Sequence, residues 1–189
     1  AIKRVPGYVD LIVVVDDGST DRTWEVLSKI CDPRLNLLKH NRNRGVGAAT
    51  KSGYRHCEKT RADLIAVMDG DGQMDGHDLA GLLDCAMSGA EYVKGNRFLH
   101  RSSIGCMPRV RHIGNRLFSW LAKRAASFDN SLDSHCGYTV IQRHALNRLA
   151  LEDLYDRYGF PTEMFFEACR AGLAVECVPV RTVYGDEVS

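Results

Sequence analysis

The sequence lacks a strong charge of either sign, and it has no long apolar run. It contains 25 Lys and Arg against 24 Asp and Glu, a net charge of +1. No overall field therefore attracts nucleic acid or an acidic partner, and we expect no nucleic-acid ligand. No apolar stretch approaches the roughly 20 residues that cross a bilayer. These absences favour a soluble protein whose charged binding sites are local.

The sequence also lacks the cysteine spacing of a disulfide framework or a zinc site. Its seven cysteines are odd in number, scattered, and never spaced as C-x-x-C. This pattern indicates a reducing, cytoplasmic compartment. With 44% hydrophobic residues among 189, the chain is long enough to bury one sizeable core. We therefore expect a single domain over residues 1–189.

Predicted strands and helices alternate along the chain. Apolar, often β-branched runs predict strands at 9–15, 35–38, 64–68, 92–95, 138–142 and 174–180. Helical spacing and composition predict helices at 21–30, 48–58, 77–87, 110–121 and 163–171. In the first helix, the residues available for a buried face are Trp24, Val26, Leu27 and Ile30. The alternation predicts an α/β fold, a mostly parallel sheet with helices on both faces.

One predicted strand ends on a cluster of acids, Asp69, Asp71 and Asp75. Ligands of open α/β sheets bind at the carboxyl ends of the strands. Asp69 and Asp71 are one residue apart, so their like charges need a cation or a shift in pKa. A hard divalent ion held by one or two carboxylates and a substrate's phosphates is the simplest compensation. The alternative is that these acids, Asp75 above all, only cap the next helix.

Other metal and phosphate motifs fit the acidic turn less well. An EF-hand loop counted from Asp69 would need Gly and Glu where Met74 and Ala80 stand. The D-x-D after a strand also resembles the haloacid-dehalogenase phosphohydrolases, in which the first Asp is a nucleophile. Those enzymes typically have Thr or Val at the position of Gln73. A phosphohydrolase with Asp69 as nucleophile stays an alternative.

Five motifs together resemble one family over essentially the whole chain. They have the order and spacing found in family 2 glycosyltransferases of the GT-A fold, closest to the branch of dolichol-phosphate mannose synthase and the polyprenyl-phosphate glycosyltransferases. The motifs are V-V-D-D-G-S-T-D (14–21), N-R-G-V-G-A-A (43–49), M-D-G-D-G-Q (68–73), K-G-N-R-F (94–98) and G-F-P-T-E-M (159–164).

The resemblance implies a nucleotide-sugar site on the two acidic turns. It assigns the contact with the nucleobase to Asp17, with Asp16 and Ser19 shaping the turn. A carboxylate is a suitable acceptor for a ring N–H of a base. The resemblance assigns Mg²⁺ or Mn²⁺, bound on the donor diphosphate, to Asp69 and Asp71. The ion would neutralise charge on the departing nucleoside diphosphate.

The remaining donor contacts come from three other places in the chain. Gln73 lies where the family places a side chain that assists the metal site. Arg97, near Lys94, fits the family's arginine that meets phosphate, and its forked donors suit that role. Asn43 and Gly45 belong to a turn that either approaches the nucleotide closely or is an ordinary turn before a helix.

The acceptor decides the role of Glu163, which matches the family's acid near the acceptor. A hydroxyl acceptor needs a general base, and Glu163 would serve as one. A lipid phosphate is already anionic at pH 7, because its second pKa is near 6. In that case Glu163 would position groups or hold a cation. Nearby, Asp133 lies in a stretch close to the family's D-x-x-x-G-[FY] pattern, and His135 is either a supporting residue or a loop histidine.

The sequence departs from the family pattern at both ends. The usual first strand, which ends in P-x-Y-N-E and lies centrally in the sheet, is missing. The Y-G-D-E-V-S stretch (184–189) resembles the point just before a basic, often membrane-embedded extension. We therefore expect one GT-A domain, truncated at both ends.

The resemblance implies an inverting, divalent-metal-dependent transferase. Its donor would be a UDP- or GDP-sugar, and its acceptor a polyprenyl phosphate at the cytoplasmic face of the membrane. A hydroxyl acceptor on a polysaccharide or glycolipid, with Glu163 as base, is the alternative. A non-catalytic nucleotide-sugar-binding subunit is a third hypothesis, because it would bind the donor without turnover.

Overall fold

A computed structural model describes residues 1–99, 133 and 135–181 of the chain. Its strands are β1 (Ile12–Asp16), β2 (Leu35–Lys39), β3 (Leu64–Val67), β4 (Tyr92–Asn96), β5 (Thr139–Gln142) and β6 (Val175–Pro179). Its α-helices are α1 (Thr23–Ser28), α2 (Val46–Glu58), α3 (Leu79–Met87), α6 (Arg143–Leu146) and α7 (Phe160–Arg170). Short 3₁₀ turns are η1 (Ile2–Arg4), η2 (Gly76–Asp78), η3 (Arg97–Leu99) and η4 (Leu151–Asp153). The predicted helix over 110–121 lies outside the described residues.

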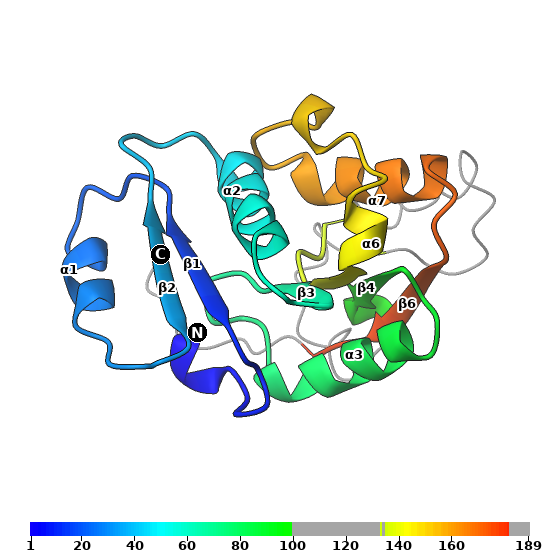
Figure 1. Ribbon diagram of the computed structural model, residues 1–189, viewed down its shortest axis with the longest axis horizontal. Coiled ribbons are helices and arrows are strands. Elements are labelled where there is room, and N and C mark those ends of the chain that lie inside the picture. The colour runs from blue at the N-terminus through cyan, green and yellow to red at the C-terminus, as the bar shows by residue number, and fades with distance from the viewer. Residues whose placement is uncertain (100–132, 134, 182–189) are drawn as a thin grey trace.

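The strands form two sheets (Figure 1). β1 and β2 pair in parallel, and the larger sheet has the order β3-β5-β4-β6. β5 is antiparallel to both of its neighbours, whereas β4 and β6 are parallel. It follows that β3, β4 and β6 run in the same direction. The predicted α/β class with a mostly parallel sheet is confirmed, and β5 is the exception.

Within the described residues, the two sheets share no hydrogen-bonded strand pair. β1 pairs with β2, β3 pairs with β5, and helix α2 packs against both β1 and β3.

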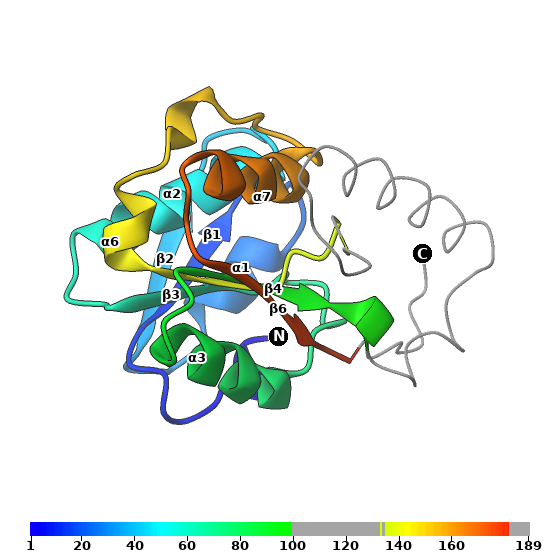
Figure 2. The same ribbon diagram turned by 90° about the vertical axis from the view of Figure 1, so that its right-hand side faces the viewer.

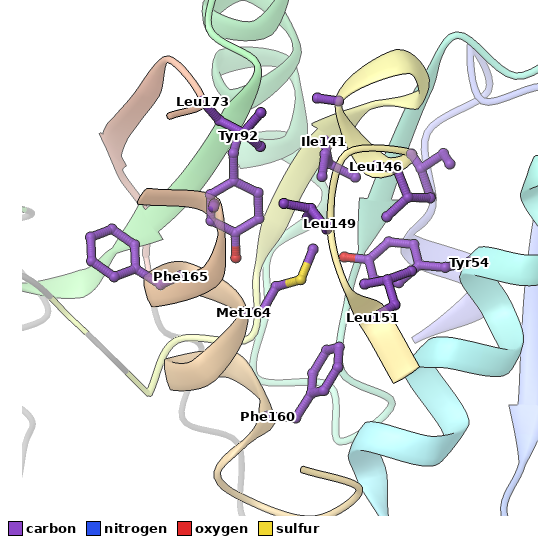
Figure 3. Close-up of a cluster of buried hydrophobic side chains, with 13 residues drawn as sticks. Tyr54, Tyr92, Ile141, Leu146, Leu149, Leu151, Phe160, Met164, Phe165 and Leu173 are labelled. Atoms are coloured by element: carbon purple, nitrogen blue, oxygen red, sulfur yellow. The ribbon is translucent and has the colours of Figure 1, made fainter. Parts of the chain in front are cut away.

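The core lies on both faces of the larger sheet, because neighbouring residues of a strand point to opposite faces. Tyr92 and Ile141 face the cluster under α6 and α7, and Val93 and Val140 face the cluster over α3. Figure 2 shows α6 and α7 on one side of this sheet and α3 on the other. The first cluster also takes Tyr54 from α2, with its hydroxyl turned toward Met164 of α7 (Figure 3). The predicted covering of both faces is thus confirmed for the larger sheet.

Helix α1 differs from its prediction. It covers Thr23–Ser28 rather than 21–30 and has no buried residue. Val26, predicted to be buried, is 57% exposed. The predicted buried face is wrong because α1 lies beside β2 of a two-stranded sheet, which offers little surface to pack on (Figure 1).

Two other helices begin earlier than predicted. Helix α2 begins at Val46, directly after Gly45, whose φ is +106°. Helix α7 begins at Phe160 and accommodates Pro161 in its first turn, where the missing N–H of proline has no intrahelical partner to lose. Among the described residues, no helix is both long and apolar enough to cross a membrane.

Candidate functional site

The acidic turn after β3 is held by hydrogen bonds from its backbone N–H groups to its own side chains. The Asp69 N–H donates to the sulfur of Met74 at 3.2 Å, and the Gln73 N–H donates to Oδ1 of Asp71 at 2.9 Å. Gly72 takes a φ of +79°, which closes the turn. Asp69 is half-buried and Asp71 is exposed. The turn therefore presents one sheltered and one accessible carboxylate.

An open pocket at the carboxyl end of β3 and β4 brings predicted site residues together. Asp69, Asp71, Gln73 and Arg97 all line it. The stretch before β5 and the end of β6 complete the lining, with His135, Cys136, Gly137, Tyr138, Val180 and Arg181. Four residues that the sequence assigned to the donor diphosphate thus share one cavity.

Gly137 lies directly against the carboxylate of Asp69. A Cβ atom built on Gly137 would lie 2.6 Å from Oδ2 and 2.9 Å from Oδ1 of Asp69, closer than any side chain allows. A side chain at this position would have to displace the Asp69 carboxylate, so the chain before β5 forms one wall of the acid pair. Sequence reasoning assigned Gly137 no role, although the D-x-x-x-G-Y spacing from Asp133 was the available signal.

The electrostatics of the pocket leave Asp69 poorly compensated. Burial raises the pKa of Asp69, and the charge of Asp71 raises it further. The charges of Lys94 and Arg97 act in the opposite direction without cancelling the rise. A cation bound between the carboxylates would remove the repulsion that raises this pKa.

Arg97 reaches the pocket already paired with a buried acid. Its guanidinium donates to both carboxylate oxygens of Asp133, at 2.5 and 2.8 Å, and its backbone N–H donates to Oδ2 at 3.3 Å. Asp133 is fully buried, so it sets the orientation of the Arg97 side chain. The predicted contact of Arg97 with phosphate stays a prediction.

The residues present fit a hard divalent ion that completes its shell from a ligand. In the part of the chain that the structure describes, no group of three or more His, Cys, Asp or Glu side chains could hold a metal. Asp69 and Asp71 alone supply carboxylate oxygens. Mg²⁺ and Mn²⁺ take such oxygen donors, and Mg²⁺ is commonly held by one or two carboxylates plus substrate phosphates. Both carboxylates line the open pocket, which has room for such a ligand.

Asp75, the third acid of the cluster, is a capping residue. Its Oδ1 accepts the His77 N–H at 3.0 Å and caps η2, which leads into α3. Its other oxygen, Oδ2, lies 3.1 Å from Nη2 of Arg181. The capping alternative is therefore confirmed for Asp75.

The acidic turn after β1 is satisfied internally at Asp17. Asp17 accepts hydrogen bonds from His40 Nδ1 at 2.6 Å, the Arg44 N–H at 3.0 Å and the Gly45 N–H at 2.7 Å. Burial alone would raise the pKa of Asp17, but these hydrogen bonds lower it below its usual value. Asp17 thus holds the turn between β2 and α2 against β1, and its contact with a nucleobase stays a prediction.

Asp16 differs from Asp17 because one of its carboxylate oxygens lacks a hydrogen-bond partner in the described part of the molecule. Its Oδ1 accepts the Ser19 N–H at 3.0 Å, as expected for a residue that shapes the turn. Its Oδ2 is buried and has no hydrogen-bond partner in the described part of the molecule. An unsatisfied buried acceptor is costly. Asp16 therefore has a free acceptor that Asp17 lacks.

The predicted turn of Asn43 and Gly45 packs tightly against a later segment. A Cβ atom on Gly45 would lie 2.4 Å from the carbonyl oxygen of Asp156, and one on Gly47 would lie 2.3 Å from that of Tyr155. Asn43 is exposed. These close approaches explain the glycines by packing, and the approach of a nucleotide stays a prediction.

Glu163 lies apart from the acid pocket. It is in the first turn of α7, it is exposed, and its Oε2 accepts the Tyr155 N–H at 2.5 Å. It is absent from the lining of the pocket that holds Asp69 and Asp71. Sequence reasoning placed Glu163 near the acceptor and did not foresee its backbone partner.

Comparison with known proteins decides the family. The model of the family "Glycosyl transferase family 2" matches residues 1–150, which include both acidic turns and Arg97. The chain belongs to glycosyl transferase family 2. The resemblance drawn from the five motifs is thereby confirmed, and so is the assignment as an enzyme of this family.

Curated relatives of this family 2 chain include enzymes that act on lipid phosphates. The UDP-N-acetylglucosamine–dolichyl-phosphate N-acetylglucosaminyltransferase of Methanococcus voltae is 27% identical over 190 residues, which cover 93% of this chain and 75% of the relative. The undecaprenyl-phosphate mannosyltransferase of Micrococcus luteus is 29% identical over 178 residues, which cover 91% and 71%. These matches support the polyprenyl-phosphate branch of the family.

Solved structures confirm the GT-A fold. Glucosyl-3-phosphoglycerate synthase of Mycobacterium tuberculosis matches with a TM-score of 0.66 at 19% identity, over 94% of this chain. Its complex with Mn²⁺, UDP and phosphoglyceric acid matches with a TM-score of 0.64 at 17% identity, over 98% of this chain. The chain spans 62% and 63% of those structures, less than two thirds.

Proposed function

We propose that this family 2 glycosyltransferase transfers a sugar from a nucleotide donor to a polyprenyl phosphate at the inner face of the membrane. The transfer depends on Mg²⁺ or Mn²⁺ and inverts the anomeric carbon. The observation that carries the proposal is the acid pair: Asp69 and Asp71 repel each other in a pocket with room for a ligand. A cation with a diphosphate is the ligand that such a pair accommodates.

The donor is held mainly through its diphosphate. Asp69 and Asp71 would hold the metal, with Gln73 beside them. The bound ion supplies neutralisation of the charge that builds on the departing nucleoside diphosphate. Arg97, oriented by Asp133, donates to a phosphate oxygen. Two relatives support this arrangement: one is named for a UDP-sugar, and the synthase structure contains Mn²⁺ with UDP.

The transfer itself is one in-line displacement. An acceptor oxygen attacks the anomeric carbon, the bond from that carbon to the diphosphate oxygen breaks, and the nucleoside diphosphate leaves with the electron pair. A lipid phosphate is already ionised near pH 7, so no general base is required. The engagement of Glu163 by the Tyr155 N–H supports this acceptor, because Glu163 then braces the segment before α7.

A hydroxyl acceptor is the alternative. Glu163 is exposed, and release from Tyr155 would free it to take a proton. Transfer assays with polyprenyl phosphate and with a glycan distinguish the two. Transfer to the glycan alone would contradict the lipid-phosphate proposal.

The proposed function is tested by thermal unfolding with UDP- and GDP-sugars, with and without Mn²⁺. A donor at 100 times its Kd stabilises the native state by about 2.7 kcal/mol. We expect such a rise in Tm for one donor class, and only when Mn²⁺ is present. No rise with any donor would contradict the proposal.

Two further outcomes decide between the remaining hypotheses. A phosphorylated Asp69 trapped after incubation with a phosphate ester would identify a phosphohydrolase. Donor binding without transfer to either acceptor would identify a binding subunit.

A further inference from the structure

Lys94 is a fully buried lysine in β4, next to the acid pocket. Its ammonium group donates to the carbonyl oxygen of Cys136 at 2.6 Å and, at a long 3.5 Å, to that of Pro161. Burial lowers the pKa of Lys94. A buried ammonium is costly unless its hydrogens are used, and here they connect separate segments of the chain.

The two carbonyl groups belong to separate segments of the chain, and only the Cys136 segment lines the acid pocket. Cys136 precedes Gly137, whose backbone lies against the carboxylate of Asp69. Pro161 is in the first turn of α7, two residues before Glu163. Figure 2 shows α7 above the sheet that contains β4. Lys94 therefore joins the segment that lies against Asp69 to the first turn of α7.

Lys94 also differs from the neighbouring Arg97 in its ion pairing. Arg97 is committed to Asp133 by a two-point ion pair. Lys94 forms no ion pair with any residue that the structure describes, yet its charge acts on Asp69. Its positive charge thus acts on Asp69 and Asp133 without a bonded carboxylate partner among the described residues.

We propose that Lys94 is a positioning residue: by holding the Cys136 and Pro161 carbonyls, it sets the Gly137 wall and thereby the geometry in which Asp69 meets a metal–diphosphate ligand. The inference rests on the proposed function, because it needs that ligand. If Lys94 only filled the core, its loss would lower stability alone.

The chain offers a matched control in Lys51 of α2. Lys51 is also buried, and its ammonium donates to the carbonyl oxygens of Leu154 and Glu152 and to Oδ1 of Asp156 at 2.9 Å. It lies away from the residues that line the acid pocket. Lys94→Met and Lys51→Met therefore remove the same kind of buried anchor at two different places.

The test measures how strongly Mn²⁺ and UDP favour each other's binding. UDP is titrated by calorimetry with and without Mn²⁺, well below the unfolding midpoint of each variant, and GDP is titrated in parallel. The ratio of the two dissociation constants is the metal coupling factor. We expect Lys94→Met to reduce this factor at least about tenfold, and Lys51→Met to leave it within about twofold.

The outcomes separate the inference from the proposed function. If neither nucleotide shows metal coupling in the unaltered protein, the proposed function fails. If coupling is present and Lys94→Met retains it, or if both lysine variants lose it equally, the positioning role is wrong. Lys94→Gln is the second variant, for the case in which Lys94→Met does not fold. Its side-chain amide keeps two N–H donors. If both Lys94 variants are unfolded at 10 °C while Lys51→Met is folded, Lys94 is structural and the inference is overturned.

Discussion

The two acidic turns of this protein look alike in sequence and differ in electrostatics. Each follows a strand and contains carboxylates close together, D-D-G after β1 and D-G-D after β3. Asp17 of the first turn accepts hydrogen bonds from His40, Arg44 and Gly45 on the β2–α2 side, and its pKa is lowered. Asp69 of the second turn is sheltered beside Asp71, and its pKa is raised.

The difference shows which carboxylate, Asp17 or Asp69, is satisfied by the protein alone. The hydrogen bonds to Asp17 come from the chain itself, so Asp17 builds the turn. The repulsion between Asp69 and Asp71 is left for a ligand to relieve. A raised carboxylate pKa in a pocket is a marker of a functional site, whereas a lowered one with backbone donors is common in structural turns.

The largest expected effect is on the second turn. Asp71→Ala should lower Mn²⁺-dependent UDP affinity about 1000-fold, or about 4 kcal/mol, because it removes the accessible carboxylate of the proposed metal site. Stability should change by less than about 0.5 kcal/mol, since Asp71 is exposed. Calorimetric titration of UDP with Mn²⁺ measures the first quantity, and urea unfolding measures the second.

Asp63→Ala is the control, because Asp63 is also an exposed aspartate but precedes β3 instead of following it. Equal affinity of the unaltered protein and Asp71→Ala for UDP with Mn²⁺ would defeat the metal assignment.

Much of this fold could be predicted from the sequence because it depends on local patterns. The apolar runs located every described strand, and the carboxyl ends of β3 and β4 brought Asp69, Asp71 and Arg97 to one pocket as expected. The direction of β5 could not be predicted, because the apolar pattern of residues 139–142 does not show whether the strand runs parallel or antiparallel to its neighbours. The burial of α1 failed for a similar reason: helical spacing shows a possible face and not what covers it.

Residues that line the pocket could be predicted from the sequence, and the groups that support them could not. Gly137 and Asp133 act on Asp69 and Arg97 from positions distant in the sequence, so no local pattern links them. The same holds for Glu163, whose hydrogen bond to the Tyr155 N–H depends on how the segment before α7 folds back. The hydrogen bonds that Asp17 accepts could not be predicted either, because they depend on the position of the β2–α2 turn.

The next effect tests the first turn. Asp17→Ala should lower the free energy of unfolding by about 2–3 kcal/mol, because it leaves His40 and the N–H groups of Arg44 and Gly45 without their acceptor. Urea unfolding monitored by circular dichroism measures the loss.

The control for that variant is Asp16→Asn, which removes a buried charge whose Oδ2 has no partner. Its unfolding free energy should stay within about 1 kcal/mol of the unaltered protein. A larger loss for Asp16→Asn than for Asp17→Ala would reverse the roles assigned to the two acids.

The smallest effect has the opposite sign in the two turns and depends on pH. The pKa of Asp17 is lowered in the folded state, so its contribution to stability is complete above the unfolded pKa of about 3.9 and is lost as pH falls through the folded value. The pKa of Asp69 is raised, so ionised Asp69 opposes folding above its folded pKa, and protonation at lower pH removes that cost.

In EDTA at pH 7, Asp69→Asn should therefore stabilise the protein by up to about 1 kcal/mol, whereas Asp17→Asn should destabilise it. In urea-unfolding series, the difference for Asp69→Asn should shrink first as the pH falls from 6, and that for Asp17→Asn should shrink only below about pH 3.9. A destabilised, metal-free Asp69→Asn protein at pH 7 would mean that Asp69, like Asp17, is satisfied by the chain itself, and the contrast between the two turns would be lost.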